Sequence, residues 1–113
     1  MHALSVVLQI LMGLAFLMSG IMKVSGNKMQ VQNFDHLRLP QWFRVITGFV
    51  QLIGAAGLII GIWEEQLTFW AGLGLAITMF FATTAHIRVK DAAKAYIAPI
   101  VLMIINLIIV FLQ

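Results

Sequence analysis

The feature that most constrains this chain is its division into four apolar blocks of about 20 residues each. The blocks cover residues 3–24, 42–62, 67–87 and 95–112. In a helix that rises about 1.5 Å per residue, such a block is long enough to cross the hydrocarbon core of a bilayer. Because 62% of the residues are hydrophobic and only 10% are charged, little sequence remains for a soluble domain. The sequence therefore predicts an all-α integral membrane protein, a single transmembrane domain folded as a polytopic four-helix bundle.

The first block has two interpretations, a spanning helix or a cleaved signal peptide. It lacks the basic residues that open a signal peptide, and its apolar run is longer than the apolar region of one. We therefore expect this block to be the first span.

The distribution of charge predicts which way the chain lies in the membrane. All seven basic residues lie in or directly beside two segments, the one that joins the first two blocks and the one that joins the last two; they are Lys23, Lys28, Arg38, Arg44, Arg88, Lys90 and Lys94. The segment between the second and third blocks carries Glu64 and Glu65 instead. Because basic loops stay on the cytoplasmic side, we expect a multi-pass protein of the cell (plasma) membrane with both termini on the non-cytoplasmic side.

The segment between the first two blocks, residues 25–40, is too polar to span a membrane and too rich in spaced apolar residues for a plain linker. Gly26 is suited to ending a helix, and Asn27 followed three residues later by Gln30 resembles a capping box that starts another. Pro40 is expected to end this second helix. The pattern predicts a short interfacial helix between the first two spans.

Polar residues inside the blocks indicate contacts between helices, because lipid offers them no hydrogen-bond partner. Gln51, Thr78 and Asn106 lie near the middle of the second, third and fourth blocks. We expect them to form one polar layer of the helix bundle, in which Gln51 and Asn106 meet directly or through Thr78 or a water molecule.

Small residues indicate where helices approach one another closely. In the first block, a stripe at spacings of three and four should face the other helices; it consists of Gln9, Gly13, Phe16, Gly20 and Lys23. The second block carries Gly48, Gly54, Gly57 and Gly61, and the third carries Gly72 and Gly74.

A second polar layer is expected at the cytoplasmic ends of the spans. We predict that Lys23, His86 and Arg88 line a ligand-binding pocket for a polar or anionic group, with Arg88 paired to Asp91. The interfacial helix, which carries Asp35 and His36, would cap this pocket. The alternative is that these residues are ordinary basic residues of span ends, which bind the headgroups of anionic lipids.

Four motifs in this order resemble the DoxX-like family of small four-helix membrane proteins: "SGIMK", "LPQWFR", "GFVQLIGAAGLIIG" and "TAHIRVKD", the last followed by Pro99. The resemblance implies four transmembrane helices, and it places family positions at Gly20, Lys23, Leu39, Pro40, His86 and Arg88. Some relatives resemble the membrane subunit of a thiosulfate:quinone oxidoreductase, some accompany redox enzymes, and distant ones look like assembly factors. Many relatives have a glutamate in the second span where this chain has Gln51, and an amide cannot relay protons.

The sequence lacks the residue patterns that several other kinds of site require. His2 and His36 fall at other depths than His86, so no pair of histidines can hold a haem between helices. Without any cysteine, the chain forms no disulfide and ligates no iron–sulfur cluster through thiolates. No metal-binding spacing, catalytic triad or phosphate-binding glycine loop is present. We assign no catalytic residue and no metal site, and the basic residues do not indicate nucleic acid because topology accounts for them.

Two classes of function remain open. The first is a quinone-linked or redox-associated membrane subunit of an oxidoreductase, without a redox centre of its own, in which a partner protein carries the electrons. The second is a non-enzymatic accessory or assembly protein for other membrane proteins. No resident cofactor is evident, although the first class would bind a quinone. The lipid bilayer, a redox partner protein and a second copy of the chain are the partners that fit these readings.

Overall fold

The computed structural model describes residues 2–91 and 93–113, and this part of the chain folds into five helices without a strand. The helices are α1 (His2–Ser25), α2 (Lys28–His36), α3 (Gln41–Ile60), α4 (Glu65–Arg88) and α5 (Ala93–Phe111). The all-α prediction is confirmed.

Among the described residues, α1, α3 and α4 are long and apolar enough to cross a membrane. The apolar stretch of α5, Tyr96–Phe111, is shorter, so the predicted fourth span and the four-span bundle stay predictions. The Cα atoms extend over 39 × 27 × 17 Å, and the longest of these dimensions exceeds the roughly 30 Å hydrocarbon thickness of a bilayer.

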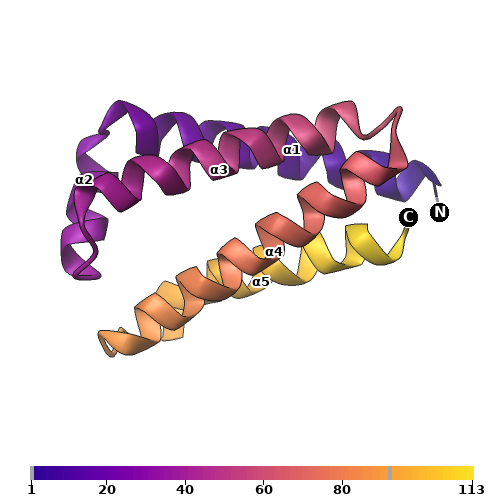
Figure 1. Cartoon of the computed structure of the whole chain (residues 1–113). Helices are drawn as coiled ribbons and strands as arrows, with labels where there is room; N and C mark the ends of the chain where they lie inside the picture. Colours follow the sequence, from indigo (N-terminus) through magenta and orange to yellow (C-terminus); the bar gives the residue numbers. More distant parts are fainter. Residues whose placement is uncertain (1, 92) are drawn as a thin grey trace.

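The long helices form two pairs that are joined at one end (Figure 1). Helix α1 lies beside α3, and α4 lies beside α5. The pairs approach each other where the two termini and the α3–α4 turn lie, which we call the closed end. They diverge toward α2 and the α4–α5 loop, which we call the open end.

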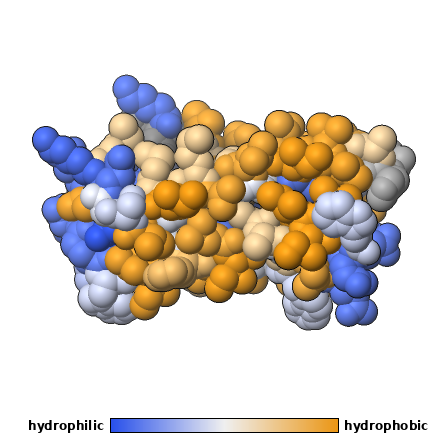
Figure 2. Space-filling model, turned by 90° about the horizontal axis from the view of Figure 1, so that it is seen from above, coloured by the Kyte–Doolittle hydropathy of each residue, from blue (hydrophilic) through white to orange (hydrophobic). Residues whose placement is uncertain are grey.

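The hydrophobic surface of the molecule forms a broad belt. Figure 2 shows hydrophobic residues over the middle of one face and hydrophilic residues gathered at both ends. Large apolar side chains are exposed on every long helix, among them Met18, Ile53, Phe81 and Phe111. A soluble monomer rarely exposes apolar surface on this scale, which agrees with three helices of spanning length in identifying a membrane protein.

Helices α1 and α3 approach each other through two glycines. A Cβ atom placed on Gly20 would lie 2.8 Å from the carbonyl oxygen of Gly48, and one placed on Gly48 would lie 3.0 Å from that of Gly20. The stripe predicted for the first block does face the other helices, since Gln9, Gly13, Phe16 and Gly20 are buried. It brings Lys23 to the open end of the same face.

Buried polar side chains connect the helices at the closed end. The Gln9 amide nitrogen donates to the Leu58 carbonyl at 2.9 Å and to the Thr68 hydroxyl at 2.8 Å. The Ser5 hydroxyl donates to the Gln9 amide oxygen at 2.9 Å and accepts from the Gln113 amide at 2.8 Å. This closed-end network (Ser5, Gln9, Thr68 and Gln113) joins α1, α3 and α4 to the C-terminal end of the chain.

The residues predicted to share a central polar layer have separate partners. Gln51 accepts a hydrogen bond from Ser19 of α1 at 2.8 Å. Asn106 donates to the Leu102 carbonyl and Thr78 to the Gly74 carbonyl, each within its own helix. The predicted direct contact between Gln51 and Asn106 is therefore not formed.

The junction between α1 and α2 follows the local sequence signals. Gly26 adopts a positive φ of 76° and ends α1, as expected. The Asn27 side chain caps α2 by accepting from the Met29 amide at 3.0 Å. The second half of the predicted capping box is absent, because the Asn27 amide donates to the Met22 carbonyl and Gln30 lies at the cavity described below. Pro40 precedes α3 rather than ending α2, which ends at His36.

Candidate functional site

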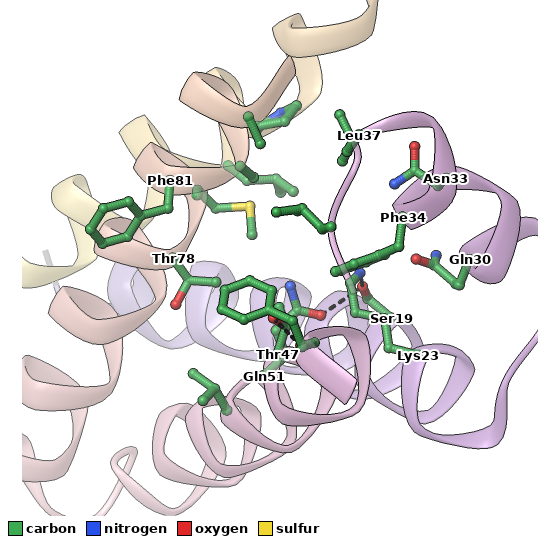
Figure 3. Close-up of a pocket in the computed structure, with 18 of the residues that line it drawn as sticks. Ser19, Lys23, Gln30, Asn33, Phe34, Leu37, Thr47, Gln51, Thr78 and Phe81 are labelled. Carbon is green, nitrogen blue, oxygen red and sulfur yellow. Dashed lines mark hydrogen bonds between the residues drawn. The ribbon is translucent and has the colours of Figure 1, made fainter. Parts of the chain in front are cut away.

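A cavity of about 460 Å³ lies between the two helix pairs toward the open end, and all five helices contribute to its wall. Most of the wall is apolar. Its polar side chains are Ser19, Lys23, Gln30, Asn33, Thr47, Gln51, Thr78 and His86. Figure 3 shows these helices surrounding the cavity, with Gln30, Asn33 and Phe34 reaching it from α2. A largely apolar cavity with a few polar groups is the usual form of a small-molecule site.

A chain of hydrogen bonds crosses from α1 to α3 in this wall. The Lys23 ammonium donates to the Ser19 hydroxyl at 2.8 Å, and the Ser19 hydroxyl donates to the Gln51 amide oxygen at 2.8 Å. Gln51 is buried, whereas Ser19 and Lys23 are half-buried. The ammonium has three donors, and among the described residues only Ser19 accepts from it. Lys23 therefore has donors left for a molecule in the cavity.

Helix α2 forms the wall at the open end of the cavity. Phe34 and Leu37 are both 4% exposed because they pack toward the interior of the molecule. The Gln41 amide nitrogen, at the start of α3, donates to the Val31 carbonyl at 3.2 Å and to the Asp35 carboxylate at 2.9 Å. These two bonds fix α2 against α3, so the apolar side of α2 covers the cavity.

Asp91 connects α2 to the opposite helix pair. Its two carboxylate oxygens accept from the His36 ring at 2.5 Å and from the His86 ring at 2.7 Å. These hydrogen bonds, first that of His86 and then that of His36, hold the pKa of Asp91 below its usual range. The Asp91 cluster (His36, His86 and Asp91) thereby attaches the end of α2 to the end of α4.

The predicted pairing of Arg88 with Asp91 is wrong. The Arg88 guanidinium instead donates to the Leu37 carbonyl and, at 3.5 Å, to the Arg38 carbonyl. The reason is a turn after α4, where Lys90 has a φ of 61° and the Asp91 amide donates to the His86 carbonyl at 3.1 Å. This turn directs the Asp91 carboxylate back toward His86.

The structure brings two of the three predicted ligand-binding residues to the cavity. Lys23 and His86 line it, while Arg88 does not and holds the segment after α2 instead. The sequence analysis did not identify Ser19 as a site residue. Its position one helical turn before Lys23 indicates that the two side chains can meet. Asn33 was missed as well, and it carries no signal beyond its place in the short polar helix.

Replacing Asp91 by asparagine should lower the thermal unfolding temperature at neutral pH, because one or both histidine contacts are lost. Since the folded-state pKa of Asp91 is depressed, its contribution to stability is present above its ordinary pKa, about 3.9. That contribution is lost as the pH falls through the lowered value. The difference from wild type should therefore shrink below about pH 4. Thermal unfolding of wild type and Asp91→Asn in detergent, from neutral pH to below about pH 4, measures this difference. Glu65→Gln, at an exposed position, is the control. A difference that is the same at every pH would contradict the prediction.

Comparisons with known proteins agree with the helical membrane architecture. Residues 7–109 match the DoxX-like family. The chain is 28% identical over 108 residues to the uncharacterized protein YdgD of Bacillus subtilis (strain 168), and the similarity covers 95% of each chain. No solved structure matches the chain. Because the match to the family extends over nearly the whole sequence, this protein is a member of the DoxX-like family.

Proposed function

We propose that this protein binds a lipid-soluble molecule with a polar, oxygen-bearing head in the open-end cavity. A quinone belongs to this class. In this role the protein is a quinone-linked membrane subunit of an oxidoreductase, and a partner protein carries the redox centre. The chain itself supplies the binding site and no electron-transferring group.

The observation that carries the proposal is the combination of an apolar cavity with the Lys23 donors. A volume of about 460 Å³ falls in the range of about 300–1,000 Å³ that is usual for small-molecule sites. The head of a quinone offers carbonyl oxygens, which accept hydrogen bonds from an ammonium group. Its ring and tail would contact the apolar wall, for example Phe34 of α2 and Met79 of α4.

Filling the cavity should weaken this binding. Ala85 lines the cavity from α4, whereas Ala56 is exposed on α3 and does not line it. We expect Ala85→Phe in lipid nanodiscs to bind a short-chain naphthoquinone at least about tenfold more weakly than wild type, a loss of about 1.4 kcal/mol. Ala56→Phe, which adds the same volume outside the cavity, should bind as wild type does.

Unchanged quinone binding in Ala85→Phe would refute the cavity as the site. If no quinone binds wild type at all, the accessory or assembly role inferred from the sequence becomes the better reading.

The proposed role includes an arrangement in the membrane. In this arrangement α5 is the fourth span, α2 lies at the cytoplasmic interface, and the cavity is on the cytoplasmic side. Basic residues near the open end, such as Lys28, Arg38 and Lys90, support it by the positive-inside rule.

This orientation can be tested directly because the chain has no native cysteine. Single cysteines at Glu65 and Lys90, both exposed, lie near opposite ends of α4. We expect an impermeant thiol reagent to label Glu65→Cys but not Lys90→Cys in intact cells, and to label both after lysis. Labelling of Lys90→Cys alone in intact cells would reverse the assignment.

A further inference from the structure

Two donors in the wall of the cavity, on Lys23 and on Gln51, are not used up by hydrogen bonds within the described residues, and the wall also holds one buried acceptor without a partner, Oε1 of Gln30. The Gln51 amide oxygen already accepts from Ser19, which leaves its amide nitrogen without an acceptor among the described residues. Gln51 is only 2% exposed, and it lines the cavity together with Lys23 and Ser19. Two nitrogen donors, one of them on a cationic group, are thus available on the same wall.

No carboxylate balances this charge within the cavity. Neither aspartate nor glutamate is among its lining residues. In the described part of the chain, Asp91 contacts His36 and His86 while Asp35 accepts from Gln41, and Lys23 forms no ion pair. A cation that is partly removed from water is stabilised by an anion in contact with it. A ligand that brings its own negative charge would supply this missing group.

The cavity also reaches the apolar surface between α3 and α4. Phe43, Ile46 and Val50 of α3 and Phe81 of α4 line it, yet they are 40%, 50%, 42% and 62% exposed, respectively. These residues therefore form a side opening whose rim is apolar. In a bilayer this opening faces lipid tails, so an alkyl chain attached to the bound head could extend through it.

We infer that the ligand of this cavity is an amphipathic acid, with an oxyanion bound by Lys23 and Gln51 and an apolar body that extends between α3 and α4. The inference rests on the proposed function, because it specifies the charge of the molecule that the same cavity binds. Two sources share this chemistry: an ionised hydroxyquinone and the carboxylate of a fatty acid.

The test compares acids with uncharged analogues of nearly the same shape. The full-length protein in nanodiscs of zwitterionic lipid is given an alkyl hydroxynaphthoquinone or its methyl ether, and separately dodecanoate or dodecanol, at a pH where both acids are ionised. We expect at least one acid to bind about tenfold more tightly than its neutral analogue. The acid that shows the larger preference identifies the source.

Variants assign this preference to Lys23. Lys23→Met should remove the preference for the acid, and Lys23→Arg should retain most of it. Lys28→Met is the matched control, because Lys28 is exposed at the start of α2 and does not line the cavity. Gln51→Glu should also remove the preference, since it places a carboxylate beside Ser19 where the oxyanion would bind. Thermal unfolding of each variant verifies that it is folded.

The possible results separate this inference from the proposed function. Equal binding of each acid and its neutral analogue would overturn the inference while leaving the cavity as a site for neutral quinones. Equal losses in Lys23→Met and Lys28→Met would also overturn it, because the oxyanion would then bind the basic surface. Absence of binding by all four compounds would overturn both proposals.

Discussion

Replacing Gly20 by alanine should lower the free energy of unfolding by about 1–3 kcal/mol, the usual cost of adding volume to a closely packed contact. A Cβ atom at this position would lie 2.8 Å from the Gly48 carbonyl oxygen and 2.8 Å from Cγ of Leu52. The carbonyl belongs to the backbone of α3 and cannot rotate away, so the two helices must separate. Unfolding in mixed micelles, followed by circular dichroism, measures the effect.

The matched control for this substitution is Gly74→Ala in α4. Gly74 is exposed, and a Cβ atom there would have no neighbour within 4 Å. Since alanine favours a helix over glycine by about 1 kcal/mol, this variant should be unchanged or slightly more stable. If both variants lose the same stability, the loss is a general effect of replacing glycine by alanine in these helices. The close approach of α1 and α3 is then not its cause.

Separation of α1 and α3 would also reach the cavity. Gly48 lies against Lys23, since a Cβ atom placed on Gly48 would be 2.9 Å from Cβ of Lys23. The glycine contact therefore fixes the distance between the helices that carry Ser19 and Gln51. We therefore expect the packing of Gly20 against Gly48 to affect both the stability of the protein and the geometry of the cavity wall.

The helices could be predicted from the sequence because hydrophobic length is a direct constraint in a membrane. The second block, predicted at residues 42–62, is observed as Gln41–Ile60. That helices approach closely at Gly20 and Gly48 was also predictable, since close approach in lipid depends on small residues, but the sequence did not pair these two glycines with each other. These features depend on composition and spacing along one helix, which a sequence displays.

The site was predicted less completely because it depends on how each helix is rotated and on how chains turn. Lys23 and His86 were recognisable from their place in the last turn of apolar helices. The partner of Gln51 was not, because spans that are apolar on nearly every side do not reveal which face meets which neighbour. Asp91 was assigned to Arg88 from their spacing of three, but α4 ends at Arg88, so helical spacing no longer applies to Asp91.

The two ends of the molecule are held together in different ways. At the open end, α2 is attached through partly exposed groups such as His36 and Asp91. At the closed end, the connecting side chains are buried, since Thr68 is 0% and Gln9 is 2% exposed. Because water cannot replace a broken hydrogen bond at the closed end, we expect the larger loss of stability there.

Replacing Gln9 by leucine should lower the free energy of unfolding by about 2 kcal/mol, because leucine has a similar volume but makes none of three hydrogen bonds worth roughly 0.6 kcal/mol each in a membrane. It leaves the Thr68 hydroxyl and the Leu58 carbonyl without their partner. Thr68→Val breaks one of the same bonds, so the double variant should lose about 0.5–1 kcal/mol less than the sum of the single ones. Gln66→Leu, at an exposed position in the first turn of α4, is the control and should have little effect on unfolding in micelles. Strictly additive losses, or an equal loss in Gln66→Leu, would show that the closed-end network does not hold the helix pairs together.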